Sequence, residues 1–76
     1  MNVSSLIVNA RDGQAANVQA LLTQQPGVEI HAASPEGKLI VAIETESDRE
    51  TVAAYERISQ TDGVLSAAMV YHQIET

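Results

Sequence analysis

Several residue types are missing or scarce in the chain, and each absence excludes a class of function. Without cysteine, the chain can form neither a disulfide nor a thiolate metal site, which is typical of a protein from a reducing compartment. Phe and Trp are also absent, so there is no platform of rings on which nucleic-acid bases could stack. Basic residues number 4 against 10 acidic ones, which leaves a formal charge of −6. Such a surface repels nucleic acid and anionic lipid and attracts cationic partners.

Long hydrophobic runs are missing as well. The first residues, 1–5, carry no basic group of the kind that opens a secretory signal, and no apolar run approaches the length of a membrane span. We therefore expect a cytoplasmic protein without membrane insertion. The chain of 76 residues allows one domain, residues 1–76, with a narrow core, because so short a chain buries only about 60% of its unfolded surface.

Hydrophobic periodicity predicts a strand, a helix and a strand in the first half of the chain. Residues 3–10 form a β-branched run, and Asp12 then caps a helix over residues 14–25. Pro26 and Gly27 end this helix. Alternating residues over 28–33 are typical of a half-buried edge strand. The apolar stripe of the helix contains Ala15, Val18, Leu21 and Leu22.

The second half repeats this order. A short turn over residues 34–37 makes the following strand, residues 37–45, antiparallel to the preceding one, and its apolar run is typical of a central strand. Ser47 and Glu50 then form a capping box, in which each side chain satisfies a backbone donor at a helix start. A last strand covers residues 64–72. The predicted buried stripe of the second helix is Val52, Tyr55 and Ile58.

Two such strand–helix–strand units predict a ferredoxin-like α+β sandwich. In this fold, right-handed crossovers place both helices on one face of a four-stranded antiparallel sheet with the spatial order 4-1-3-2.

Alternation along the strands assigns the side chains to two faces. The helix side is expected to take Leu6, Val8, Val28, Ile30, Leu39, Val41, Ile43, Leu65, Ala67, Met69 and Tyr71. The open side is left with Ser5, Ile7, Asn9, Ile40, Ala42, Val64, Ser66, Ala68, Val70 and His72. This second set is too apolar for a merely solvated face, and such patches usually mark interaction surfaces. A ligand platform and a homodimer that stacks sheet on sheet fit the pattern equally well.

The sequence lacks the residues of an active site. His31 and His72 lie on different predicted strands without carboxylates or thiols at ligand spacing, so no metal site is predicted. Ser4 and Ser5 have neither a nucleophile elbow nor suitable His and Asp partners. The glycines belong to turns rather than to a phosphate loop, and the acidic residues of 44–50 complement a helix dipole. We expect a protein that is not an enzyme and needs no cofactor.

Four segments resemble the NapD family, the small chaperones of periplasmic nitrate reductase. They are residues 5–8 (SLIV), 26–30 (PGVEI), 37–41 (GKLIV) and above all 63–73 (GVLSAAMVYHQ). The resemblance covers nearly the whole chain, and its most specific part is the ending Val70-Tyr71-His72-Gln73. It implies a cytoplasmic protein that binds the twin-arginine signal peptide of the catalytic subunit, NapA, and holds back export until the molybdenum cofactor is inserted. The ten open-side residues are then expected to contact the peptide.

Two other classes of function stay open at this point. Small-molecule regulatory domains of the ACT or Lrp-effector type share the predicted strand order and bind amino acids at dimer interfaces. They usually carry a glycine-rich loop after the first strand, for which residues 11–14 (RDGQ) are a weak match. A purely structural subunit is the third class. Monomeric and weakly dimeric states are both compatible with the sequence.

Overall fold

The computed structural model describes residues 2–74, with only the backbone described for residues 71–74. Six elements follow one another in the predicted order: β1 (Asn2–Ala10), α1 (Ala15–Thr23), β2 (Val28–Ala33), β3 (Lys38–Thr45), α2 (Asp48–Ser59) and β4 (Val64–Ile74). None of the helices described is long and apolar enough to span a membrane.

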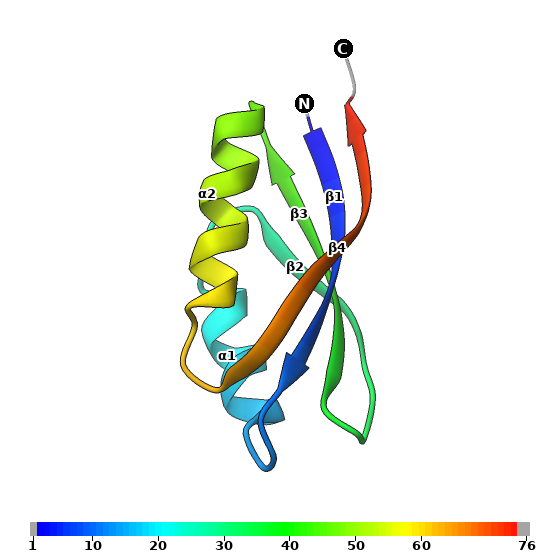
Figure 1. Ribbon diagram of the computed structural model, residues 1–76, viewed down its shortest axis with the longest axis vertical. Coiled ribbons are helices and arrows are strands. Elements are labelled where there is room, and N and C mark those ends of the chain that lie inside the picture. The colour runs from blue at the N-terminus through cyan, green and yellow to red at the C-terminus, as the bar shows by residue number, and fades with distance from the viewer. Residues whose placement is uncertain (1, 75–76) are drawn as a thin grey trace.

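The strands form one antiparallel sheet in the order β2-β3-β1-β4. Both helices cover the same face, so the molecule has a helical layer and a sheet layer (Figure 1). β1 lies inside the sheet, because it pairs with β3 on one side and with β4 on the other. The predicted ferredoxin-like topology is therefore confirmed.

Strict alternation in β1 and β3 separates the core from the opposite face. Every second residue of β1, from Asn2 to Ala10, is buried, and the residues between them are half-buried. In β3, Leu39, Val41 and Ile43 face the helices and are at most 1% exposed. The hydrophobic core is formed by Leu6, Val8, Ala10, Val18, Leu22, Leu39, Val41, Ile43, Ala54, Ile58 and Val64.

The start of α2 follows the capping-box prediction with one change. The Ser47 hydroxyl accepts a hydrogen bond from the Glu50 amide at 3.2 Å, as predicted. The Glu50 carboxylate reaches one residue further back and accepts from the Glu46 amide at 2.8 Å. The predicted cap of α1 is wrong, because Gln14 occupies the N-cap position without a side-chain hydrogen bond and Asp12 lies in the preceding turn.

The predicted buried stripe of α2 is wrong at one position. Val52 is 58% exposed, whereas Thr51, Ala54 and Ile58 are buried. Tyr55 is half-buried, and its hydroxyl donates to the Ala67 carbonyl of β4 at 2.6 Å.

Register shifts in β4 correct two face assignments. Asn9 pairs with Ser66 and Ala10 with Val64, so Leu65 is left without a partner in β1. As a result, Val64 packs into the core at 8% exposure instead of lying on the open face. Leu65, predicted to be in the core, is 59% exposed. An extra residue in one strand reverses the alternation that the sequence pattern assumes.

A similar shift interrupts β2. Ile30 pairs with Val41 and Ala32 with Ile40, so His31 is the unpaired residue. Val28 and Ile30 pack against the core as predicted. Beyond His31 the alternation reverses, because Ala32 now pairs with an open-face residue of β3. The short outer strand β2 thus carries a bulge, which is common at sheet edges.

Candidate functional site

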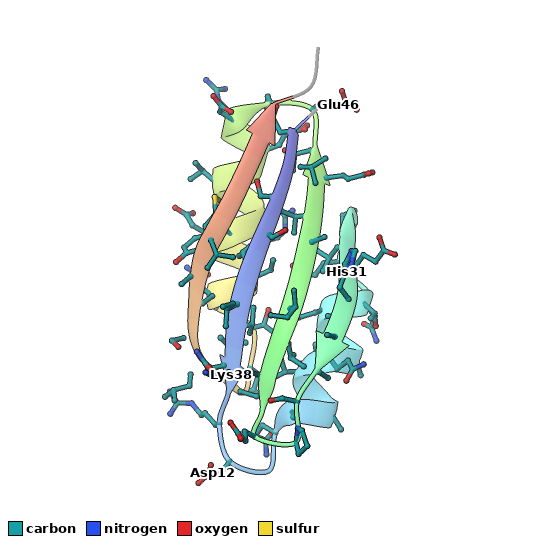
Figure 2. All side chains as sticks on the ribbon, turned by 90° about the vertical axis from the view of Figure 1, so that its right-hand side faces the viewer. Asp12, His31, Lys38 and Glu46 are labelled. Atoms are coloured by element: carbon teal, nitrogen blue, oxygen red, sulfur yellow. The ribbon has the colours of Figure 1, made fainter. Side chains whose placement is uncertain are left out.

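The helix-free face of the sheet, called the open face below, presents a central apolar strip. Ile7 in β1 pairs directly with Ile40 in β3 and with Ala68 in β4. Figure 2 looks onto this face, with β1 and β3 in the middle and β4 and β2 at the two sides. Ile7 is half-buried and Ile40 is 39% exposed, so both side chains can contact a ligand.

Most of the residues predicted for the open face do meet there. Ser5 pairs with Ala42, and Asn9 pairs with Ser66, to whose hydroxyl its side-chain amide donates at 3.1 Å. Val70 is 57% exposed and lies at the register shift between Met69 and Tyr71. Val64 is on the opposite face, as described above.

Two predicted side-chain placements fall outside the described residues. They are those of Tyr71, assigned to the helix side, and His72, assigned to the open side. For both residues only the backbone register is described, which pairs Tyr71 with Ser5 and His72 with Ser4.

One end of the open face is hollowed. A depression of about 540 Å³ lies over the β1, β3 and β2 strands, and its lining combines an apolar floor with polar side chains. Val3 and Glu44 are direct partners across β1 and β3, and Glu29 pairs with Ala42. Its lining residues are Val3, Ser5, Gly27, Val28, Glu29, His31, Ala42 and Glu44.

The two carboxylates of this hollow are exposed and belong to neighbouring strands. Glu29 faces Ala42, two residues before Glu44, so the two acids are diagonal neighbours, for which a spacing of about 7–8 Å is typical. His31 Nε2 lies 3.8 Å from Glu29 Oε2, and the Glu29 side chain remains 78% exposed. The hollow therefore combines two acidic groups with the nearby apolar strip.

This acidic pair is not among the residues predicted for the open face. Glu29 lies between the inward-facing Val28 and Ile30, and Glu44 follows Ala42 by two positions. The same alternation that selected Ala42 therefore placed both acids on the open face. In the sequence, Glu44 also belongs to the acidic run of residues 44–50, whose predicted role is to complement a helix dipole.

Two other acids of that run, Asp48 and Glu50, have structural roles. Glu50 caps the helix start through the Glu46 amide, and Asp48 accepts a hydrogen bond from the Asn2 side chain at 2.9 Å. Asp48 and Glu50 also lie in the first turn of α2, where negative charge stabilises the helix dipole.

The chemistry available on the open face is that of binding. Among the described residues, no group of three His, Cys, Asp or Glu side chains is placed to hold a metal ion. An apolar strip beside two exposed carboxylates suits a ligand with cationic groups at one end and apolar groups at the other.

Comparison with known proteins identifies the family. The model of the family described as NapD protein matches residues 1–76. The chain belongs to the NapD family. Chaperone NapD of Escherichia coli K12 is 34% identical over 74 residues, covering 96% of this chain and 85% of that protein. Chaperone NapD of Paracoccus pantotrophus is 35% identical over 74 residues, covering 97% of this chain and 65% of that protein.

Solved structures agree with this assignment. The solution structure of the E. coli Tat proofreading chaperone protein NapD superimposes with a TM-score of 0.86 at 34% identity, covering 96% of this chain and 78% of that one. A hypothetical protein from Pyrococcus horikoshii has a TM-score of 0.84 at 19% identity, covering 100% and 93%, which shows a shared fold. Because the curated NapD relatives are named chaperones, the expectation of a non-enzymatic protein is confirmed at the level of the family.

Proposed function

We propose that this NapD protein is a cytoplasmic chaperone that binds the twin-arginine signal peptide of the nitrate reductase catalytic subunit, NapA. While it is bound to the signal peptide, the chaperone delays export until the cofactor has been inserted and maturation is complete. The observation that carries the proposal is the open face, where an apolar strip ends in a hollow with two carboxylates. Family membership and the close structural likeness to the E. coli Tat proofreading chaperone protein NapD support it.

A twin-arginine signal peptide has the matching chemistry. It carries two adjacent guanidinium groups followed by an apolar segment, and guanidinium groups form strong, often bidentate hydrogen bonds with carboxylates. Glu29 and Glu44 offer two such carboxylates on neighbouring strands. The apolar segment then lies along the strip of Ile7, Ile40 and Ala68, which gives the peptide one direction on the sheet.

The two contributions respond differently to salt. Exposed ion pairs are screened over about 8 Å at physiological ionic strength, whereas apolar contacts are not screened. We therefore expect Glu29→Gln and Glu44→Gln to weaken binding at low salt, with the loss shrinking as salt rises. Ile7→Asp and Ile40→Asp should abolish binding at every salt concentration, because each places a charge under the apolar segment.

Calorimetric titration with a twin-arginine peptide tests the proposal. A peptide with both arginines replaced by glutamine measures the charge contribution from the ligand side. Glu36→Gln is the matched protein control, because it removes the same charge from the β2–β3 turn, outside the hollow. Unchanged affinity in folded Ile7→Asp and Ile40→Asp proteins would show that the open face is not the site. Binding of a free amino acid instead of the peptide would favour the small-molecule regulatory class.

A further inference from the structure

The two outer strands of the sheet differ in how their free edges are protected. An outer strand exposes a row of backbone N–H and C=O groups that can pair with another strand, and proteins usually blunt such edges with charge, proline, bulges or short length. β2 is short, bulged at His31, and carries Glu29. β4 is 11 residues long and contains neither proline nor Asp, Glu, Lys or Arg. Register shifts at Leu65 and Val70 interrupt its pairing with β1, and residues 66–69 between them pair without interruption. The β4 edge is therefore bulged, but neither charge nor proline protects it.

Exposed apolar side chains gather beside this uncharged edge. Leu65, Met69 and Val70 of β4 are 59%, 38% and 57% exposed, and Val52 of α2 is 58% exposed. A groove of about 270 Å³ runs between α2 and β4 and is lined by Thr51, Val52, Tyr55 and Met69. Ile40 is the one large exposed apolar residue of the described chain that lies elsewhere. Clusters of this kind mark interaction surfaces.

The charge pattern selects a second copy of the chain as the occupant. Two copies with a formal charge of −6 each repel one another over most of their surface, but β4 brings no charged side chain to the contact. A basic peptide would find no carboxylate in β4, whereas the hollow on the open face offers two. The carboxylate that does line this surface, that of Asp48 beside Val52 and Met69, accepts a hydrogen bond from the Asn2 side chain. A two-fold axis between two antiparallel β4 strands makes the same patch meet itself, as a closed dimer requires.

We propose that two copies of this chain associate through their β4 edges, so that the two sheets continue as one. Because α2 lies beside β4, the same two-fold axis brings the two α2 helices next to each other, and Val52 and Met69 of each copy then cover the groove of the other. The Tyr55 bond to the Ala67 carbonyl survives, since a carbonyl oxygen has two lone pairs. The free edge of β4 is the outermost boundary of the sheet opposite β2 (Figure 2).

This arrangement differs from sheet-on-sheet stacking in one testable respect. Stacking would bury the open face and compete with a peptide there. Pairing at the β4 edge leaves both open faces uncovered and on the same side of the continuous sheet. Dimerisation and peptide binding are therefore separable, and each proposal can fail without the other.

Sedimentation equilibrium over a wide concentration range tests the dimer. The apparent molecular mass of the unmodified chain is expected to rise from the monomer value of 8.1 kDa towards twice that value as the protein concentration increases. Val52→Lys should remain at the monomer mass. In the dimer, the two-fold axis would bury the lysine of one chain next to the same lysine of the other, and the two positive charges would repel each other. The fold should be kept, since Val52 is exposed and Lys is the better helix former. Leu65→Lys, also at an exposed position, is the second variant.

The control separates the interface from net charge. Each lysine changes the formal charge from −6 to −5, which lowers the general repulsion between copies. Ala20→Lys makes the same change on the exposed face of α1 and should dimerise at least as well as the unmodified chain. Peptide affinity should be equal in all three variants. A monomer mass at every concentration, or a dimer that persists in both Val52→Lys and Leu65→Lys, would overturn the proposal.

Discussion

Replacing Gly27 by alanine should destabilise the fold more than the same change at Gly13. Both glycines have a positive φ, 75° at Gly27 and 77° at Gly13, which costs an L-residue about 1–2 kcal/mol. A Cβ added at Gly13 meets nothing within 4 Å. At Gly27 it would lie 2.5 Å from the carbonyl oxygen of Glu44, which is backbone and cannot rotate away. Gly13→Ala therefore measures the φ cost alone.

The magnitude of the difference follows from this contact. Forcing backbone apart in a packed region costs about 1–3 kcal/mol. We therefore expect a loss of about 1–2 kcal/mol in the free energy of unfolding for Gly13→Ala and about 2–5 kcal/mol for Gly27→Ala. The hydrogen bond from the Glu44 amide to the Gly27 carbonyl, 2.9 Å long, should also be strained.

Urea denaturation followed by far-UV circular dichroism measures both losses. In a domain of this size 1 kcal/mol corresponds to about 4–8 °C in Tm, so thermal melts should separate the variants as well. Gly27 and Glu44 both line the hollow, so folded Gly27→Ala should also bind the twin-arginine peptide more weakly. Equal destabilisation of the two variants would refute the reasoning from the close contact.

Three further changes test the packing of the domain. Leu39→Asp should prevent folding, because it buries an unpaired charge at a position with 0% exposure. Loss of chemical-shift dispersion in the amide NMR spectrum would show that the chain is unfolded. Ser47→Ala should lower the free energy of unfolding by about 1 kcal/mol through loss of the cap to Glu50, and an unchanged urea midpoint would contradict it. Tyr55→Phe should cost about 0.5–1.5 kcal/mol by removing the bond to the Ala67 carbonyl, again measured by urea denaturation.

The fold was predictable because local signals and hydrophobic alternation agreed in β1 and β3. The pairing of β1 with β3 contains no extra residue, so parity correctly separates Leu6 and Val41 from Ile7 and Ala42. The capping signal at Ser47 was equally reliable, because it depends on residues only three positions apart.

The errors lie where an outer strand contains an extra residue. The bulges at Leu65 and His31 reverse the alternation, and nothing in the local sequence distinguishes them from regular strand. Val52 is exposed for a different reason: it lines a groove with Met69 of β4, and β4 is an outer strand with no further strand beside it to cover that groove. Within the site, the apolar strip was predictable, whereas the hollow with Glu29 and Glu44 depends on how three strands meet.

The central position of β1 has a consequence for the timing of folding. β1, the first strand of the sheet along the chain, pairs with β4, the last, and Asn2 lies opposite Ile74. Pairing over such a sequence separation is slow, because a long loop must close before its contacts stabilise it. While the chain is still emerging from the ribosome, β1 can pair with β3, but the Ala68 side of the open face cannot form. The open face therefore stays incomplete in the nascent chain until β4 has emerged.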